Sequence, residues 1–281
     1  MKKSFTTLAL ITMASIAQPI FTTAPYYSYT KYSDQFKENS NGMGIYASLY
    51  NYPHQVEFSI DYTNIKFKQN IPKYEQTEMT GVYSYFLNKN LFLKGGLHFV
   101  ASDYRPSNEG LATIITGADY KLDNSNYGLE LFYSNYAKYT PKSLKITQAH
   151  PYFKYHFSPK DKMFGSFDLM VDFNYIKPSK SYLYQDVKDS YGSTGLKLTN
   201  SNGNWSTSVE KWIGKRAFAL EDGGFTLYNL SQIYTGGYGA GITYHIKDKA
   251  SIKLKYNRKN YIDYNKKGHS DGISSSFAYT W

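Results

Sequence analysis

The feature that most constrains the fold is a repeated alternation of apolar and polar residues, which runs from about Pro25 to the C-terminus. Each run spans roughly 8 to 15 residues and ends in a cluster of turn-forming residues. Because successive side chains of a strand point to opposite sides of a sheet, such a run predicts a strand with one apolar and one polar face. A succession of these strands predicts an all-β protein built from hairpins.

Several runs alternate regularly enough to assign their faces. In one of them Phe167, Leu169, Val171, Phe173 and Tyr175 share a face, opposite a polar face that contains two aspartates. Other apolar faces assigned in this way are Val56–Phe58–Ile60–Tyr62, Leu91–Leu93–Leu97–Phe99, Phe153–Tyr155–Phe157, Tyr238–Ala240–Ile242–Tyr244 and Ile252–Leu254–Tyr256. A soluble β-sandwich would also alternate, so strand length and the chain ends must decide between the two classes.

The connections between the runs are of two kinds. Short, turn-rich joints fall at residues 51–54, 88–90, 123–126, 159–162, 200–204 and 247–249. Longer connections fall near 34–41, 69–75, 103–110, 139–143, 178–187, 214–230 and 264–271. If the chain enters near Pro25, all short joints lie on one side and all long ones on the other, as in outer-membrane barrels. We count 14 strands, with 12 as the alternative. If the first run, near residues 26–33, is not a strand, both the count and the assignment of sides must be revised.

Composition agrees with a barrel. Aromatic residues make up 18% of the chain, mean hydropathy is -0.54, and there is no cysteine to form a disulfide or a thiolate metal site. No run of about 20 apolar residues follows the N-terminal segment, which excludes a helical membrane protein. The strands approach the roughly 9 to 11 residues that cross a bilayer at a tilt, longer than those of most globular sheets.

The N-terminal segment predicts a secretory signal peptide. Lys2 and Lys3 form a positive start, an apolar stretch covers residues 5–16, and a small residue, Ala17, stands at the expected cleavage site. We expect cleavage after Ala17, giving a signal peptide of residues 1–17, with cleavage after Ala24 as the alternative. Residues 25–281 are then a single β-barrel domain.

The C-terminal strand carries the strongest family signal. Phe277, Tyr279 and Trp281 place aromatic rings at alternate positions up to the last residue. This ending resembles the C-terminal insertion signature of bacterial outer-membrane β-barrels, although phenylalanine is commoner than tryptophan at the last position. The resemblance implies a transmembrane antiparallel up-and-down barrel of the monomeric porin-like type, with both termini periplasmic. It also implies outer-membrane lipid, lipopolysaccharide and the barrel-insertion machinery as partners.

The polar faces predict the lining of the barrel lumen. The candidate pore-lining residues are Glu57, Asp61, Lys94, Glu130, Lys154, Asp168, Asp172, Lys197, Lys253 and Lys255. Acids and bases are similar in number, so the formal net charge of +10 does not by itself predict anion selectivity. Opposed rows of charge would orient passing solutes, as charged rings do in channels. Alternatively, neighbouring rows of opposite charge form ion pairs, such as one between Lys154 and Asp168, and serve only to keep the lumen hydrated. We predict no cofactor.

The longest connection is a candidate constriction loop. Residues 214–229 include Lys215, Arg216, Glu221 and Asp222, followed by two glycines. A loop of this length would narrow the pore if it folded inward, but an exposed loop is the interpretation we favour. The glycines between Gly236 and Gly241 lie inside a predicted strand with no helix after them, so they do not predict a phosphate site.

Enzyme motifs are weak. Gly268–His269–Ser270–Asp271–Gly272 contains the residue types of a serine hydrolase, but adjacent residues at an expected loop tip indicate a turn. His150 and His156 share a strand face at a spacing of roughly 20 Å, too far apart to hold one metal ion. We therefore predict a porin-like channel for small polar or charged solutes. The alternatives are an outer-membrane hydrolase of the phospholipase or lipid A deacylase type and a surface interaction barrel.

Overall fold

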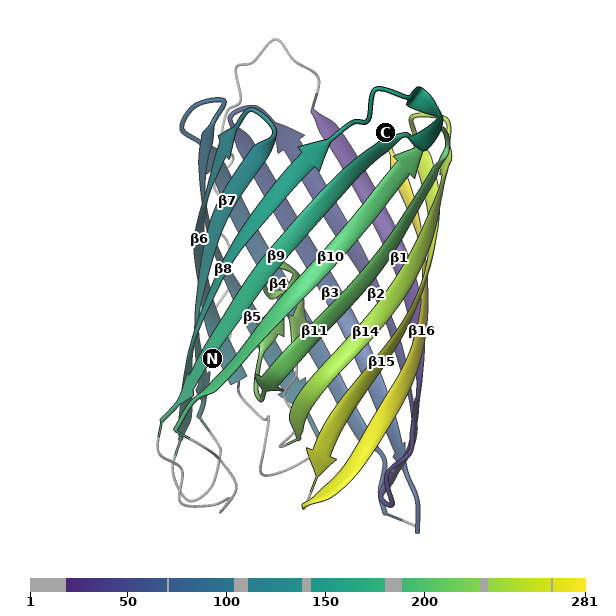
Figure 1. The fold of residues 1–281 in the computed structure, drawn as a ribbon. Helices are drawn as coiled ribbons and strands as arrows, with labels where there is room; N and C mark the ends of the chain where they lie inside the picture. The colour runs from purple at the N-terminus through teal and green to yellow at the C-terminus, as the bar shows by residue number, and fades with distance from the viewer. Residues whose placement is uncertain are drawn as a thin grey trace.

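The computed structural model describes residues 19–69, 71–103, 111–137, 143–179, 189–227, 232–263 and 265–281. The chain forms one closed antiparallel barrel (Figure 1), in which each strand pairs with its neighbours in sequence and the last strand pairs with the first. The barrel contains 14 strands, which confirms the predicted fold class and strand number. Within the described residues no helix is long and apolar enough to cross a membrane.

The barrel strands share a length of 12 to 15 residues. They are β1 (Ile20–Tyr32), β2 (Lys37–Asn51), β3 (His54–Phe67), β4 (Tyr74–Phe86), β5 (Leu91–Ser102), β6 (Leu111–Leu122), β7 (Ser125–Tyr136), β8 (Leu144–Phe157), β9 (Ser166–Pro178), β10 (Tyr191–Asn202), β11 (Trp205–Arg216), β14 (Ile233–Ile246), β15 (Ala250–Asp263) and β16 (Lys266–Thr280). A short 3₁₀ turn, η1 (Lys162–Phe164), connects β8 to β9.

The predicted faces are confirmed by the alternation of exposure along the strands. On β3, for example, Val56, Phe58 and Ile60 are exposed on the outer surface, whereas Ser59 between them is buried inside the barrel. The outward rings and aliphatic chains form the apolar surface that a bilayer would cover. The inward positions carry most of the charged and hydroxyl side chains, which gives the barrel a polar interior.

Two predicted loops are strands in the structure. Residues 37–41 belong to β2 and residues 266–271 belong to β16, so the first connection shortens to residues 33–36 and the second strand begins directly at Lys266. These strand ends lack alternation because charged and hydroxyl residues occupy both of their faces. Consequently the prediction of a turn at Gly268–Gly272 is wrong, since this segment lies within β16 and pairs with β15 and β1.

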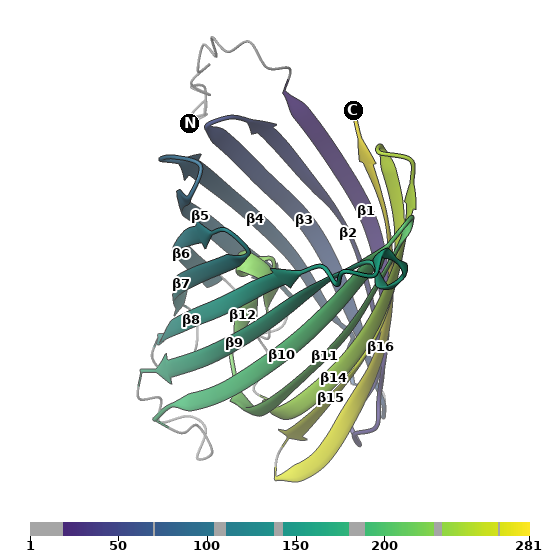
Figure 2. The same cartoon turned by 45° about the horizontal axis from the view of Figure 1, so that its top comes forward.

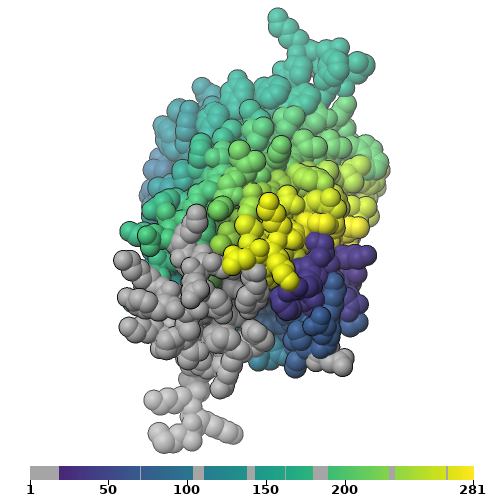
Figure 3. Space-filling view, turned by 60° about the horizontal axis from the view of Figure 1, so that its bottom comes forward, coloured from purple at the N-terminus to yellow at the C-terminus, as the bar shows by residue number. Residues whose placement is uncertain are grey.

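The barrel closes along the β1–β16 seam, where the purple and yellow ends of the chain lie side by side on the surface (Figure 3). The hydroxyls of Thr22 and Thr280 are 3.1 Å apart across it, and the Trp281 amide donates to the Phe21 carbonyl at 2.9 Å. The predicted signal peptide, residues 1–17, lies outside the described residues. Because β1 already pairs from Ile20, a cut after Ala24 would remove the start of a paired strand.

Candidate functional site

The segment after β11 folds into the barrel instead of extending from its end. We call residues 217–227 the lumen loop. It contains the two-residue strands β12 (Leu220–Glu221) and β13 (Thr226–Leu227), joined by the 3₁₀ turn η2 (Asp222–Gly224). Figure 2 shows this hairpin inside the ring of barrel strands. The structure thus contradicts the exposed loop that we favoured, and agrees with the inward alternative.

The backbone of the lumen loop is bonded directly to the barrel wall. The Leu220 amide donates to Oε1 of Gln148 at 2.8 Å, and Nε2 of Gln148 donates to the Leu220 carbonyl at 2.7 Å. Gln148 lies on the inward face of β8 and is buried. A buried backbone amide and carbonyl need hydrogen-bond partners, and the Gln148 side chain supplies the two hydrogen bonds that a neighbouring strand would otherwise form.

Apolar packing fills the space between the lumen loop and one side of the wall. Ala217, Phe218, Ala219 and Leu220 are all at most 1% exposed. The Phe218 ring meets that of Tyr136 edge to face, with centroids 5.6 Å apart. Leu220 packs with three inward apolar side chains of β4, β6 and β7, which are Val82, Ile115 and Phe132. Burial of this segment by the wall is the main physical reason for its inward position.

A glycine is needed at the tip of the lumen loop. Gly224 has φ +101°, a left-handed conformation that favours glycine. A Cβ atom there would lie 2.3 Å from Cδ1 of Ile115, closer than two carbon atoms can approach. The chain therefore turns against the wall only because this side chain is absent.

Charged side chains continue the contact between loop and wall. Arg216, at the end of β11, is buried, and its guanidinium pairs with Glu221 of the lumen loop and lies 3.5 Å from Asp172 of β9. His150 lies between Asp172, at 3.6 Å, and Glu130, at 2.9 Å. Glu130 also pairs with Lys94 of β5. This row of alternating charge satisfies buried ions that would otherwise be costly.

The two sides of the lumen differ in accessibility. We call β4 to β9 the packed wall, because nearly all its inward residues facing the lumen loop are buried. We call β15, β16, β1 and β2 the accessible wall, because its inward residues are half-buried or exposed over the middle of the barrel. Solvent therefore reaches the interior along the accessible wall, beside the lumen loop.

Small side chains explain this accessibility. The inward positions of β16 between its ends are occupied only by Ser, Gly and Ala. Cross-strand pairing continues the pattern around the barrel, and the row that contains Lys255 reads Ser208, Gly241, Lys255, Ser274, Ser28 and Gly42. The hydroxyls of Ser28 and Ser208 lie beside Gly42 and Gly241, so this row presents short polar groups where β4 to β9 present rings and branched chains.

All ten predicted pore-lining residues lie at inward positions, but the structure does not bring them together in one cluster. Glu130, Lys94 and Asp172 join the charged row described above. The lysines Lys197, Lys253 and Lys255 lie on β10 and β15, whereas Glu57 and Asp61 lie on β3. In the cross-strand row of Lys253, Ser276, Tyr26 and Gly44 separate it from Asp61.

The predicted pairing of Lys154 with Asp168 does not occur. Register places His156 opposite Asp168, and its Nδ1 lies 2.9 Å from the carboxylate. Lys154 instead lies over the ring of Tyr152, with Nζ 4.6 Å from the centroid. Of the predicted loop residues, Arg216 and Glu221 pair with each other, and Asp222 accepts a hydrogen bond from Thr226 at 2.9 Å. Lys215 is the half-buried residue before Arg216 on β11.

Several lumen residues were missed by the sequence analysis. Glu210 pairs with Lys255 at 2.7 Å, and Glu78 and His98 are buried together on β4 and β5. Alternation alone would have placed all three inward. The role of Gln148 could not be predicted in this way, because no local sequence pattern shows that a glutamine will form hydrogen bonds with a segment distant in the sequence. The glycines of β14 make room for β11, since a Cβ at Gly237 would lie 2.7 Å from Nε1 of Trp212.

The hydrolase alternative gains no support from geometry. On β16, His269 and Asp271 face outward, with Nε2 3.6 Å from the carboxylate, while Ser270 is buried on the opposite face. A second hydroxyl and imidazole pair, Thr80 and His98, is bonded at 2.8 Å, but both residues are wholly buried, so no substrate reaches the hydroxyl. Among the described residues no group of three His, Cys, Asp or Glu side chains could hold a metal ion.

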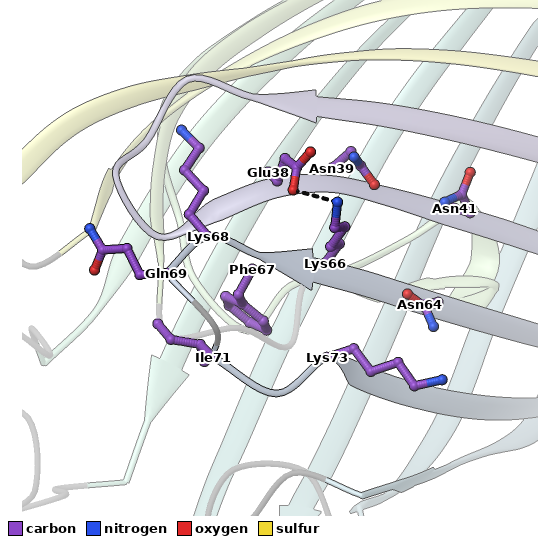
Figure 4. A pocket seen from close by; sticks show the side chains of 10 residues that line it. All are labelled: Glu38, Asn39, Asn41, Asn64, Lys66, Phe67, Lys68, Gln69, Ile71 and Lys73. Carbon is purple, nitrogen blue, oxygen red and sulfur yellow. Dashed lines mark ion pairs between the residues drawn. The ribbon is translucent and has the colours of Figure 1, made fainter.

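A separate cavity of about 580 Å³ lies outside the lumen, beside the start of β2 and the end of β3 (Figure 4). Asn39, Asn41, Asn64 and several lysines line it, and Lys66 pairs with Glu38 at 2.9 Å. Asn41 and Asn64 occupy outward positions, so this cavity is not part of a path through the barrel.

No protein-family model and no curated protein sequence matches the chain. Among solved structures, the CymD monoaromatic hydrocarbon channel matches with a TM-score of 0.58 at 9% identity, over 93% of this chain and 87% of that chain. The Ralstonia pickettii toluene transporter TbuX gives 0.57 at 7% identity, over 93% and 88%. A bacterial polysaccharide outer membrane secretin gives 0.59 at 6%, over 92% and 98%.

At these identities the likeness concerns the fold alone. All three matches extend over nearly the whole of both chains, and they agree with the closed barrel and its apolar outer surface. The chain therefore has the fold of a bacterial outer-membrane β-barrel, with no subfamily identified.

Proposed function

We propose that the protein is an outer-membrane channel for small polar or charged solutes, which pass along the accessible wall beside the lumen loop. The observation that supports this most is the asymmetric interior. Hydroxyl groups, glycines and lysines face the accessible side, while the lumen loop fills the opposite side with buried apolar contacts. A solute on the accessible side meets polar groups that can replace its hydration shell.

The lumen loop sets the width of this path. Its Phe225 ring contacts the Tyr46 ring of β2 edge to face at 5.6 Å, while Asp222 lies near the lysines of β15. Its tip therefore spans the small residues of β16 and β1. A barrel of this size would otherwise leave a wider lumen, so the loop acts as the constriction.

Passage of an apolar solute is the second candidate, since two of the matched structures are a hydrocarbon channel and a toluene transporter. Both apolar clusters inside this barrel, however, consist of side chains that the lumen loop already covers. The inward residues of β15 and β16 that solvent reaches are mostly lysines, serines and other polar side chains. We therefore favour polar solutes. The proposal also includes the predicted signal peptide and a periplasmic location for both termini.

Planar-bilayer recording of the purified protein tests the channel. We expect discrete current steps, and larger steps when residues 218–227 are replaced by a Gly-Ser segment of equal length. The matched control replaces the β3–β4 connection, residues 68–73, in the same way, and should leave the step size unchanged. Absence of steps in both the wild type and the lumen-loop variant would show that the protein is not a channel.

A further inference from the structure

The lysines of the accessible side gather at the tip of the lumen loop. Lys197 of β10 is half-buried, and Lys253 and Lys255 of β15 occupy successive inward positions. All three interact electrostatically with Asp222 of the loop. Lys253 also interacts with Lys197 and Lys255, so the three ammonium groups lie close enough to repel one another.

The acids of the described residues do not balance these cations. Glu210 pairs with Lys255 at 2.7 Å, and Asp222 is shared among all three lysines. Lys197 and Lys253 form no hydrogen bond or ion pair with any residue of the described ranges. Three lysines against the two carboxylates of Glu210 and Asp222 leave a net positive charge, which favours an anion among them.

The pKa of Asp222 reflects the positive electrostatic potential of these lysines. Burial raises the pKa of this carboxyl group, but Lys255, the Thr226 hydroxyl, Lys197 and Lys253 outweigh burial and hold the pKa below its ordinary value. The carboxylate thus stays ionised, and its position next to the lysines marks where a negatively charged oxygen is stabilised.

Hydroxyl side chains neighbour the lysines on adjacent strands. Ser208 and Ser274 lie in the cross-strand row of Lys255, and Gly241 separates Ser208 from it. In the row of Lys253 the neighbours are Thr243 and Ser276. Hydroxyl groups donate hydrogen bonds to oxyanions, and all four of these side chains are short.

We propose that Lys197, Lys253 and Lys255, at the tip of the lumen loop, form a binding site for small oxyanion-bearing solutes. This inference rests on the proposed channel function and names its substrate class. An anion enters along the small residues of β16 and β1 and exchanges its water for the ammonium and hydroxyl groups. Asp222 prevents the site from holding the anion too tightly to release it, because conduction requires exit as well as entry.

Reversal potentials in a potassium chloride gradient test the site. We expect the wild type to prefer chloride, and the Lys197→Gln/Lys253→Gln double variant to lower the chloride-to-potassium permeability ratio by roughly tenfold. The control is Lys31→Gln/Lys211→Gln, which removes the same charge from outward positions of β1 and β11. A cation-preferring wild type, or equal shifts in the two double variants, would overturn the site.

Calorimetric titration of inorganic phosphate into the detergent-solubilised barrel separates this inference from the channel itself. We expect binding to the wild type and to the outward control, and loss of binding in Lys197→Gln/Lys253→Gln. If current steps are absent but this pattern is obtained, the channel function fails while the anion site stands. Equal phosphate binding by all three proteins would refute the site whatever the conductance.

Discussion

The Gln148→Met variant should open the constriction, because this side chain holds the lumen loop to the wall through two hydrogen bonds, at 2.8 and 2.7 Å. Methionine has nearly the same shape but cannot bond, which leaves the Leu220 amide and carbonyl without these partners. Each lost bond costs about 0.5 to 1.5 kcal/mol, so the loss for the two together is roughly 1 to 3 kcal/mol. A change of this size corresponds to about a 5- to 150-fold shift towards the displaced loop.

The assay is the fraction of time that single channels spend in the larger conductance state. Gln148→Met should raise this fraction by a factor in that range. Gln148→Met also removes a hydrogen bond that Gln148 donates to Asn174 within the packed wall. The control variant must therefore lose a buried hydrogen bond of the packed wall that does not involve the lumen loop. Thr113→Val does this, since the Thr113 hydroxyl bonds the Ser134 hydroxyl of β7, at 2.8 Å. The reasoning is refuted if Gln148→Met and Thr113→Val give the same occupancy as the wild type.

Three further predictions concern the loop tip, the turn before β2 and the C-terminus. Gly224→Val should displace the lumen loop, because its Cβ would clash with Ile115, and the step size should rise towards that of the Gly-Ser replacement. Asp34→Asn should lower the melting temperature at neutral pH. Burial raises the pKa of Asp34, but Lys37, at 3.1 Å, and the Tyr261 hydroxyl outweigh burial and hold the pKa below 3.8. The ionised carboxylate therefore stabilises the fold above pH 3.8, and this stabilisation is lost as the pH falls through the lowered pKa. Wild type and variant should therefore converge in strongly acidic buffer, and a constant difference would contradict the assignment. Trp281→Ala should reduce the amount of heat-modifiable, folded barrel in outer-membrane fractions, whereas Trp205→Ala, another exposed tryptophan, should not; equal yields would remove Trp281 from the insertion signal.

Period-two alternation was enough to predict the strands and their faces. It works on β3 and β9 because a bilayer requires an apolar outer face while the lumen requires a polar inner one. It failed at residues 37–41 and 266–271, where the strands continue although both faces are polar. No apolar partner has to be matched at such strand ends, so the sequence carries no alternation there.

The lumen loop was harder to predict because its inward position depends on distant residues. Attention to the charges of Arg216, Glu221 and Asp222 suggested a surface loop, yet the apolar run Ala217–Leu220 is the informative signal. An exposed connection has no reason to carry Phe218 and Leu220, whose burial requires the wall of β4 to β9. The partner of Asp168 could not be predicted either, because a shift of register decides between Lys154 and His156.

Current block by a thiol reagent tests most directly whether solutes pass along the accessible wall. The chain has no cysteine, so single cysteines at Ser276, on the accessible wall, and at Thr113, on the packed wall, can be compared without background. A negatively charged, water-soluble methanethiosulfonate should reduce the current of Ser276→Cys and leave that of Thr113→Cys unchanged. Block of Thr113→Cys with an unaffected Ser276→Cys would contradict the account.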